Sequence, residues 1–166
     1  MKLIFAAALL ACLVSPVAPG QKANKNNDGE FKSLIERYFA AWSSLNPDNA
    51  APMYAKDADL VFYDIAPLKY TGWTEYEKGV RNVLGGFASL KLTPNSDLKV
   101  TRRGNVAWTT VTFHLSAKQK SGGQMEMDGR HTAIWERRGG KWLIVHEHNS
   151  FPVDLATGRA DFSRTP

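Results

Sequence analysis

The segment Gly139–Ser150 reads GGKWLIVHEHNS and joins a tight turn to a long run of strand-forming residues. Two successive glycines tolerate positive φ, which suits the turn of a β-hairpin. The same pattern recurs toward the N-terminus in residues 98–103, 106–118 and 124–138, which are separated by the turn sequences RGN and SGG. Together with a last strand over 141–151, these runs predict a meander of long antiparallel strands.

The segment that precedes the meander predicts helices. Between residues 31 and 44, apolar side chains recur at helical spacing, which indicates an amphipathic helix. A short second helix is expected over 50–55 and a strand pair within 59–72. A third helix follows, in which Thr74 and Glu77 have the spacing of a capping box. Helices followed by long hairpins predict an α+β domain, with three N-terminal helices packed against one face of a curved antiparallel sheet.

The first 20 residues have the three parts of a secretory signal peptide. Lys2 precedes an apolar run over 3–14, and small residues lead to Gly20, after which cleavage is expected. The run is shorter than the 20 or so residues that span a bilayer, so no membrane span is expected. A periplasmic or secreted protein is therefore predicted. The alternative is a lipoprotein anchored at Cys12, because LLAC resembles a lipoprotein cleavage box.

The remaining chain divides into three parts. Residues 21–29 are polar and lack periodicity, which predicts a flexible leader. One domain is expected over 30–153, followed by a loose tail over 154–166. Cys12 is the only cysteine of the chain, so the mature protein is expected to contain no disulfide.

Charge and motifs exclude several classes of function. The formal net charge is +5, but the basic residues are scattered and not interleaved with stacking aromatics, so no nucleic-acid partner is expected. The chain has no Gly-x-Ser-x-Gly nucleophile motif and no glycine-rich phosphate loop. We therefore expect no cofactor and a small molecule as the ligand.

Four motifs resemble one known family. They are YAKDAD at 54–59, YTGW at 70–73, RHT at 130–132 and GKWLIVHEHNS at 140–150. Their order and spacing resemble a SnoaL-like domain of the nuclear-transport-factor-2-like superfamily, in its ketosteroid-isomerase-like branch, over residues 30–153. The resemblance implies a cone-shaped fold that encloses a pocket, and commonly a homodimer formed through the sheet.

The same resemblance leaves the activity open. The superfamily includes isomerases, cyclases, dehydratases and plain binding modules, so fold alone does not assign chemistry. Beside the ketosteroid isomerases, Tyr38 falls where their oxyanion-binding tyrosine lies, and Asp64 falls where their catalytic base lies. Their second, protonated acid has no counterpart in 130–133, which reads RHTA. Proton transfer on a carbonyl-containing ligand, of isomerase, cyclase or lyase type, therefore competes with a non-catalytic periplasmic binding or dimeric accessory module.

A set of candidate site residues follows from these comparisons. Strict alternation along the last strand puts His146 and His148 on one face with Trp142. Two histidines at this spacing lack the third ligand that a zinc site needs, so no metal is expected. The alternative for both histidines is a hydrogen-bonded structural role. The expected catalytic residues are Asp64, Tyr38 and His148, and the expected ligand-binding residues are Trp42, Tyr54, Trp73, Arg130, Trp142 and His146.

Overall fold

A computed structural model describes residues 25–160 of the chain. The expected signal peptide with Cys12, the first part of the expected leader and the end of the expected tail lie outside these residues. Helix α1 spans Lys25–Ser43 and therefore includes residues 25–29, which were expected to be a flexible leader. Neither described helix is long and apolar enough to cross a bilayer.

The expected second helix is instead a pair of short 3₁₀ turns, η1 (Pro47–Asn49) and η2 (Ala51–Met53). The side chain of Asn46 accepts a hydrogen bond from the backbone of Asp48 at 3.1 Å and starts the first turn. Each turn contains a proline, which lacks the N–H that a longer α-helix would use. The chain therefore closes i to i+3 hydrogen bonds and stops.

The strand pair and the third helix follow as predicted, but the helix begins earlier. Strand β1 (Val61–Tyr63) pairs antiparallel with β2 (Tyr70–Thr71), and α2 spans Gly72–Leu84. Thr74 and Glu77 therefore lie inside the helix, and the predicted capping box is wrong. The carboxylate of Glu75 accepts the backbone N–H of Thr71 at 2.9 Å instead.

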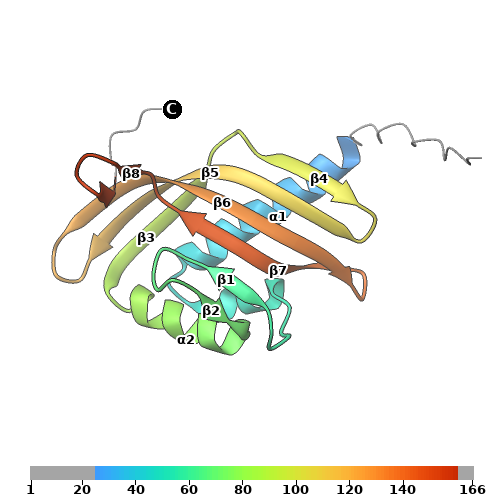
Figure 1. Cartoon of the computed structure of the whole chain (residues 1–166), viewed down its shortest axis with the longest axis horizontal. Coiled ribbons are helices and arrows are strands. Elements are labelled where there is room, and N and C mark those ends of the chain that lie inside the picture. The colour runs from blue at the N-terminus through green and yellow to red at the C-terminus, as the bar shows by residue number, and fades with distance from the viewer. Residues whose placement is uncertain (1–24, 161–166) are drawn as a thin grey trace, which may run out of the picture.

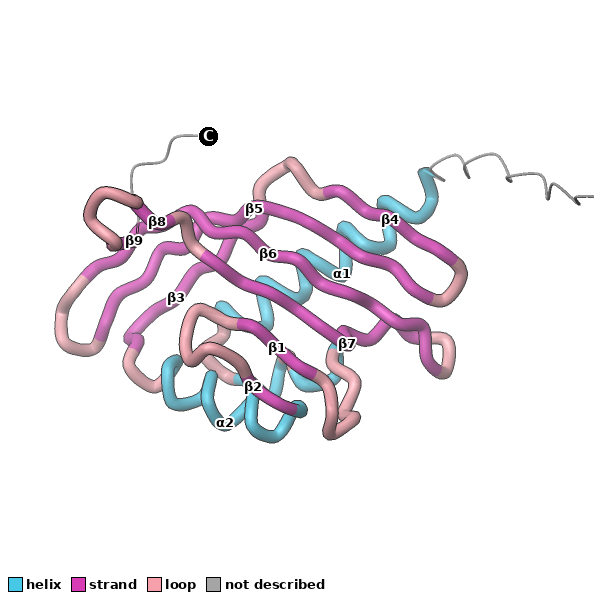
Figure 2. The backbone as a smooth tube through the Cα atoms, viewed as in Figure 1, coloured by secondary structure: helices cyan, strands magenta, loops and turns pink. Residues whose placement is uncertain are grey.

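Figures 1 and 2 show seven of the strands as one curved sheet, with α1 lying across one of its faces and α2 near β1 and β2. The strand order is β2-β1-β7-β6-β5-β3, with β4 also paired to β5, and all pairs are antiparallel except β1 with β7. The α+β class and the curved, mostly antiparallel sheet are thus confirmed. The long strands are β3 (Phe87–Pro94), β4 (Lys99–Arg103), β5 (Val106–Gln119), β6 (Gln124–Arg138) and β7 (Lys141–Ser150).

Two elements were not predicted. Strand β3 lies where only a connection to the meander was expected, and it pairs with the second half of β5. The segment expected to be a loose tail begins with a small hairpin of β8 (Val153–Asp154) and β9 (Arg159–Ala160).

A β-bulge in β7 decides which side chains face the helices. Ile134 of β6 pairs with His146, but the next β6 residue, Trp135, pairs with Ile144. Val145 is therefore an extra residue with no partner on β6. A bulge of this kind shifts the inward and outward alternation of the strand by one position.

The bulge corrects the expected orientation of the two histidines. Trp142 is buried on the helix side of the sheet, and beyond the bulge Glu147 and Asn149 are the buried residues of β7. His148 is exposed and His146 is half-buried on the opposite face. The residues between the two histidines, and not the histidines themselves, enter the interior.

A close contact between α2 and β2 offers a test of the fold. A methyl group on Gly79 would overlap the ring of Tyr70, whose hydroxyl donates to the carbonyl of Ala66 at 2.9 Å. We expect Gly79→Ala to destabilise the protein by about 1–3 kcal/mol through overpacking, although alanine favours a helix. The exposed Asn82→Ala on the same helix should be neutral or stabilising. Denaturant unfolding measures both, and a stabilised Gly79→Ala variant would show that Tyr70 does not pack there.

Candidate active site

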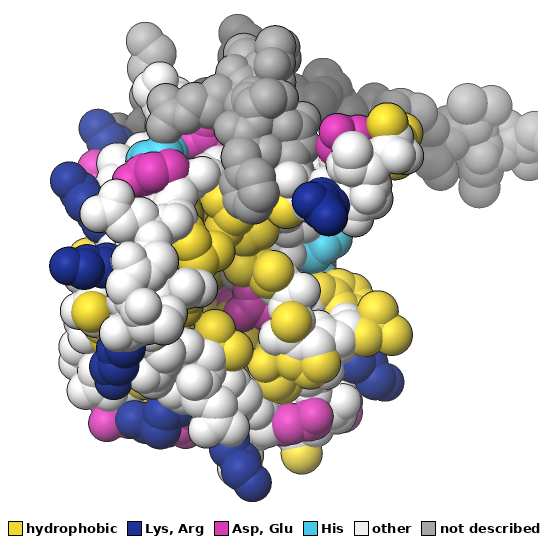
Figure 3. Space-filling model, turned by 90° about the vertical axis from the view of Figure 1, so that its left-hand side faces the viewer, with side chains coloured by type: hydrophobic (Ala, Val, Ile, Leu, Met, Phe, Trp, Pro, Cys, Tyr) yellow, Lys and Arg dark blue, Asp and Glu magenta, His cyan; other side chains and the backbone are white. Residues whose placement is uncertain are grey.

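The helices and the concave face of the sheet enclose a cavity of about 410 Å³. Its walls come from α1, the segment after β1, α2, β3, β5, β6 and β7, and they are mostly aliphatic, aromatic and methionine side chains. Figure 3 shows the cavity as a hollow bordered by hydrophobic side chains, with an acidic side chain visible inside. An apolar, concave site with few polar groups is typical of a small-molecule pocket.

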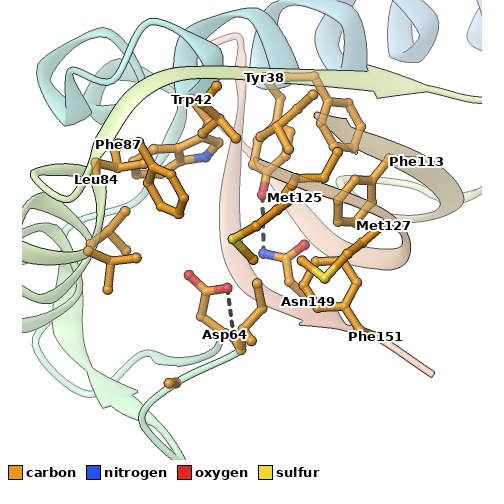
Figure 4. A pocket seen from close by; sticks show the side chains of 18 of the residues that line it. Tyr38, Trp42, Asp64, Leu84, Phe87, Phe113, Met125, Met127, Asn149 and Phe151 are labelled. Carbon is orange, nitrogen blue, oxygen red and sulfur yellow. Dashed lines mark hydrogen bonds between the residues drawn. The ribbon is translucent and has the colours of Figure 1, made fainter. Parts of the chain in front are cut away.

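Four polar residues interrupt this apolar lining: Tyr38, Asp64, Tyr76 and Asn149. Figure 4 shows Tyr38, Asp64 and Asn149 pointing into the cavity from α1, the segment after β1 and β7. Among the described residues that line the cavity, Asp64 is the only one with a charged side chain. None of these lining residues is a lysine or arginine that could neutralise it.

The surroundings of Asp64 favour a basic carboxylate. Its side chain is half-buried where it borders the cavity, and loss of hydration there raises its pKa. The N–H of Ile65 donates to its Oδ1 at 2.8 Å, and the hydroxyl of Tyr76 lies 3.5 Å from its Oδ2. Both contacts lower the pKa and oppose part of the rise. A carboxylate with a raised pKa accepts a proton more readily near neutral pH.

A second acid lies behind the cavity wall. Glu147 is fully buried, and its carboxyl is hydrogen-bonded to the hydroxyls of Tyr54, at 2.7 Å, and Tyr76. The pKa of Glu147 is raised to about 8, mainly by burial; the nearby Asp64 contributes to the rise, whereas the tyrosine hydrogen bonds oppose it. Glu147 is therefore protonated at neutral pH.

The tyrosines around this acid form one connected group. Tyr76 and Tyr54 are hydrogen-bonded to the carboxyl of Glu147, and burial followed by the charge of Glu147 raises the pKa of Tyr38, Tyr54 and Tyr76. We call Glu147, Tyr38, Tyr54 and Tyr76 the acid–tyrosine cluster. These polar groups can be buried together because they form hydrogen bonds with one another and with neighbouring side chains.

Asn149 is held in one orientation by its neighbours. His131, which is neutral because burial lowers its pKa to about 4, donates from Nδ1 to Oδ1 of Asn149 at 2.8 Å. The amide nitrogen of Asn149 donates to the Tyr38 hydroxyl at 3.4 Å. The amide N–H group of Asn149 therefore lies on the Tyr38 side, where it borders the cavity.

Three of the predicted site residues border the cavity. Tyr38, Trp42 and Asp64 line it, as expected from the sequence. Tyr54 and Trp73 are buried behind the lining, where their ring centroids lie 4.5 Å apart. They support the site without bordering the cavity.

The other predicted residues lie elsewhere. Arg130 is exposed on the outer face of the sheet, so it does not pair with Asp64. His148 is exposed on that face, and His146 donates from Nδ1 to the carbonyl of Val61 at 2.7 Å, because the bulge turns both histidines away from the helices. Trp142 faces inward but packs against Phe31, with ring centroids 5.1 Å apart, and does not line the cavity.

The buried acid predicts a pH-dependent stability. An acid whose folded pKa is about 8, against an ordinary 4.5, contributes stability that is complete below pH 4.5 and is lost as pH rises through 8. Between pH 6.5 and 8, the free energy of unfolding should fall by about 2 kcal/mol. His131, with a pKa of about 4, affects the pH dependence of stability only below pH 6.5. Burial lowers the pKa of Lys56 to about 8, so Lys56 affects this pH dependence mainly above pH 8.

Glu147→Gln should remove this loss, because glutamine carries no ionisable proton. Denaturant unfolding at several pH values measures the effect in both proteins. Parallel pH dependences in the variant and in the natural protein would contradict a raised pKa at Glu147.

Comparisons with known proteins agree with this geometry. A solved protein of the nuclear transport factor 2-like superfamily from Salmonella enterica matches with a TM-score of 0.73 and 20% identity, over 84% of this chain and all of that one. A similar protein of unknown function from Pseudomonas putida matches with a TM-score of 0.71 and 25% identity, over 86% and 99% of the two chains.

No match was found among curated proteins. The model of one protein family, described as the SnoaL-like domain, matches residues 31–154 and so covers α1 from residue 31 on, α2, the seven-stranded sheet and every residue that lines the cavity except Ala160. The chain therefore belongs to the SnoaL-like domain family, and it shares the fold of these nuclear-transport-factor-2-like proteins.

Proposed function

We propose that the cavity binds an apolar small molecule with a carbonyl group, and that Asp64 removes a proton from the carbon next to that carbonyl. The observation that carries the proposal is the Asp64 carboxylate, which borders an apolar cavity with a raised pKa and no basic residue among the described lining residues. A general base of this kind contributes about 10²–10⁴-fold to a proton-transfer rate.

The proposed step needs only groups that the chain supplies. The C–H bond breaks, its proton goes to Asp64, and its electron pair moves so that negative charge develops on the carbonyl oxygen. The Tyr38 hydroxyl and the Asn149 amide border the same cavity and supply hydrogen-bond donors for that charge. Return of the proton to another carbon is an isomerisation, and loss of a leaving group is an elimination. His148 has no part in this step because it lies on the outer face.

A non-catalytic binding module is the second candidate. It is favoured by the small number of polar groups in the cavity, since an apolar ligand binds through burial of its surface alone. In this case Asp64 and Asn149 orient the ligand without turnover. The same probe molecule distinguishes the two candidates, because binding without proton exchange supports the module.

We also propose that the protein is exported as a homodimer that associates through the outer sheet face. The signal-peptide pattern of residues 1–20 supports export. Val106 and Trp108 project from that outer face with exposed fractions of 41% and 37%, which leaves apolar surface that a second copy would cover.

The dimer can be tested at the exposed tryptophan. Trp108→Glu should give a monomer in sedimentation at micromolar concentration, because a carboxylate would be buried without a partner in the interface. Trp108→Phe keeps an apolar ring and should remain a dimer. A natural protein that sediments as a monomer under these conditions would rule the dimer out.

The chemistry can be tested with 1-tetralone, an apolar bicyclic ketone, by following deuterium exchange next to its carbonyl in heavy water by NMR. Asp64→Asn should lower the exchange rate at least about 100-fold, because the base is removed. Asp59→Asn, an exposed site nearby, should leave the rate unchanged. Equal exchange rates in Asp64→Asn and the natural protein, or bound tetralone without exchange, would reject Asp64 as a base.

A further inference from the structure

Glu147 is connected to the cavity through tyrosine hydroxyls. Tyr76 is hydrogen-bonded to the acid and also lines the cavity, whereas Tyr54 is hydrogen-bonded to the acid but lies behind the lining. Of the two hydroxyls that are hydrogen-bonded to Glu147, that of Tyr76 is therefore the one that reaches the cavity.

Counting donors and acceptors distinguishes these two tyrosines. Trp42 donates from Nε1 to the Tyr54 oxygen at 3.1 Å, and Asn149 donates to the Tyr38 oxygen at 3.4 Å. Among the hydrogen bonds of the described residues, no nitrogen donor reaches the Tyr76 oxygen. A buried carboxyl proton needs an acceptor. The Tyr76 oxygen, which already contacts the acid, is the one that has room for it.

We propose that Glu147 is a positioning residue that controls whether the cavity contains the Tyr76 hydroxyl as a hydrogen-bond donor. When Glu147 is protonated, it donates to the Tyr76 oxygen, and the Tyr76 O–H turns toward the cavity. There it meets Oδ2 of Asp64, at 3.5 Å, or the oxygen of a bound ligand. When Glu147 is ionised, it draws the Tyr76 proton to itself and the cavity loses this donor.

The environment of Glu147 supports two such states. An ionised carboxylate buried among apolar groups needs every nearby hydroxyl proton, whereas a neutral carboxyl does not. The pKa of about 8 puts the change at mildly alkaline pH, and the charge of Asp64 contributes to that rise. The tyrosines of the acid–tyrosine cluster remain protonated through this range, because burial raises their pKa values.

Two other titratable groups lie close to the cluster. His131 packs against Tyr38 with ring centroids 4.4 Å apart, and it stays neutral because burial lowers its pKa to about 4. Lys56 lies 3.5 Å from the ring centroid of Trp73, and burial lowers its pKa to about 8. Lys56 therefore titrates in the same range as Glu147 and must be removed in a control.

The test is an NMR titration of the full chain between pH 6 and 9.5, with ¹³C labels in the glutamate carboxyls and the tyrosine ring carbons that carry the hydroxyls. We expect the Glu147 and Tyr76 signals to shift together with a midpoint near 8. Lys56→Gln should leave this midpoint in place. A Glu147 signal that titrates below pH 6, or a Tyr76 signal that stays constant while Glu147 titrates, would overturn the proposal.

The variants give a second readout that a merely structural role would not change. The affinity for 1-tetralone should fall about fivefold from pH 6.5 to 9, the effect of one lost hydrogen bond. Glu147→Gln should remove this pH dependence. Tyr76→Phe should bind about fivefold more weakly than the natural protein at pH 6.5 and equally at pH 9, because the natural protein has lost the Tyr76 donor by then. A pH dependence that persists in either variant would contradict the role of Glu147.

This inference rests on the proposed function only for the carbonyl of the ligand, and the two can fail separately. Joint titration of Glu147 and Tyr76 without any Asp64-dependent exchange supports the positioning role and rejects the proton transfer. Asp64-dependent exchange with an invariant Tyr76 signal supports the proton transfer and rejects the positioning role.

Discussion

The need to satisfy one buried carboxyl organises the whole interior. Among the described residues no cation pairs with Glu147, so its burial depends on hydroxyls that come from two different helical segments: Tyr54 after η2 and Tyr76 from α2. Each of these hydrogen bonds ties a helical segment to β7. Loss of the acid would therefore affect the docking of the helices on the sheet as well as the chemistry of the pocket, because a partly satisfied polar network is costly.

The same arrangement separates the cavity into two regions with different tasks. Aliphatic, aromatic and methionine side chains form most of the wall and suit apolar ligands of varied shape. The polar groups Tyr38, Asp64, Tyr76 and Asn149 supply orientation, and each is held by a hydrogen bond to a neighbour: Tyr38 to Asn149, Asn149 to His131, Asp64 to the Ile65 N–H and Tyr76 to Glu147. Rigid support of this kind preorganises a site. The fold thus combines an apolar cavity wall that accepts ligands of varied shape with a few polar groups in fixed positions.

Sequence reasoning found the parts of the fold that follow from local periodicity. The faces of α1 and α2, the hairpins and the placement of Tyr38 and Asp64 in the pocket could all be predicted. Glu147 could not, because strict alternation along the last strand put it on the face opposite Trp142 and the two histidines, and a one-residue bulge at Val145 leaves no local signal in a run of strand-formers. Tyr76 was predicted only as part of an apolar helix face, since its hydroxyl partner comes from a residue 71 positions away.

The bulge at Val145 also bears on how sequences of this family should be aligned. A relative whose last strand lacks the extra residue would carry the matching acid and amide one position nearer to the Gly-Lys-Trp turn while pointing them into the same cavity. An alignment without a gap in this strand would then set His146 against that acid and report the acid as lost. Placing a single-residue gap at Val145 brings the inward-facing positions back into correspondence, so equivalence here is counted from the sheet pairing and not from the turn.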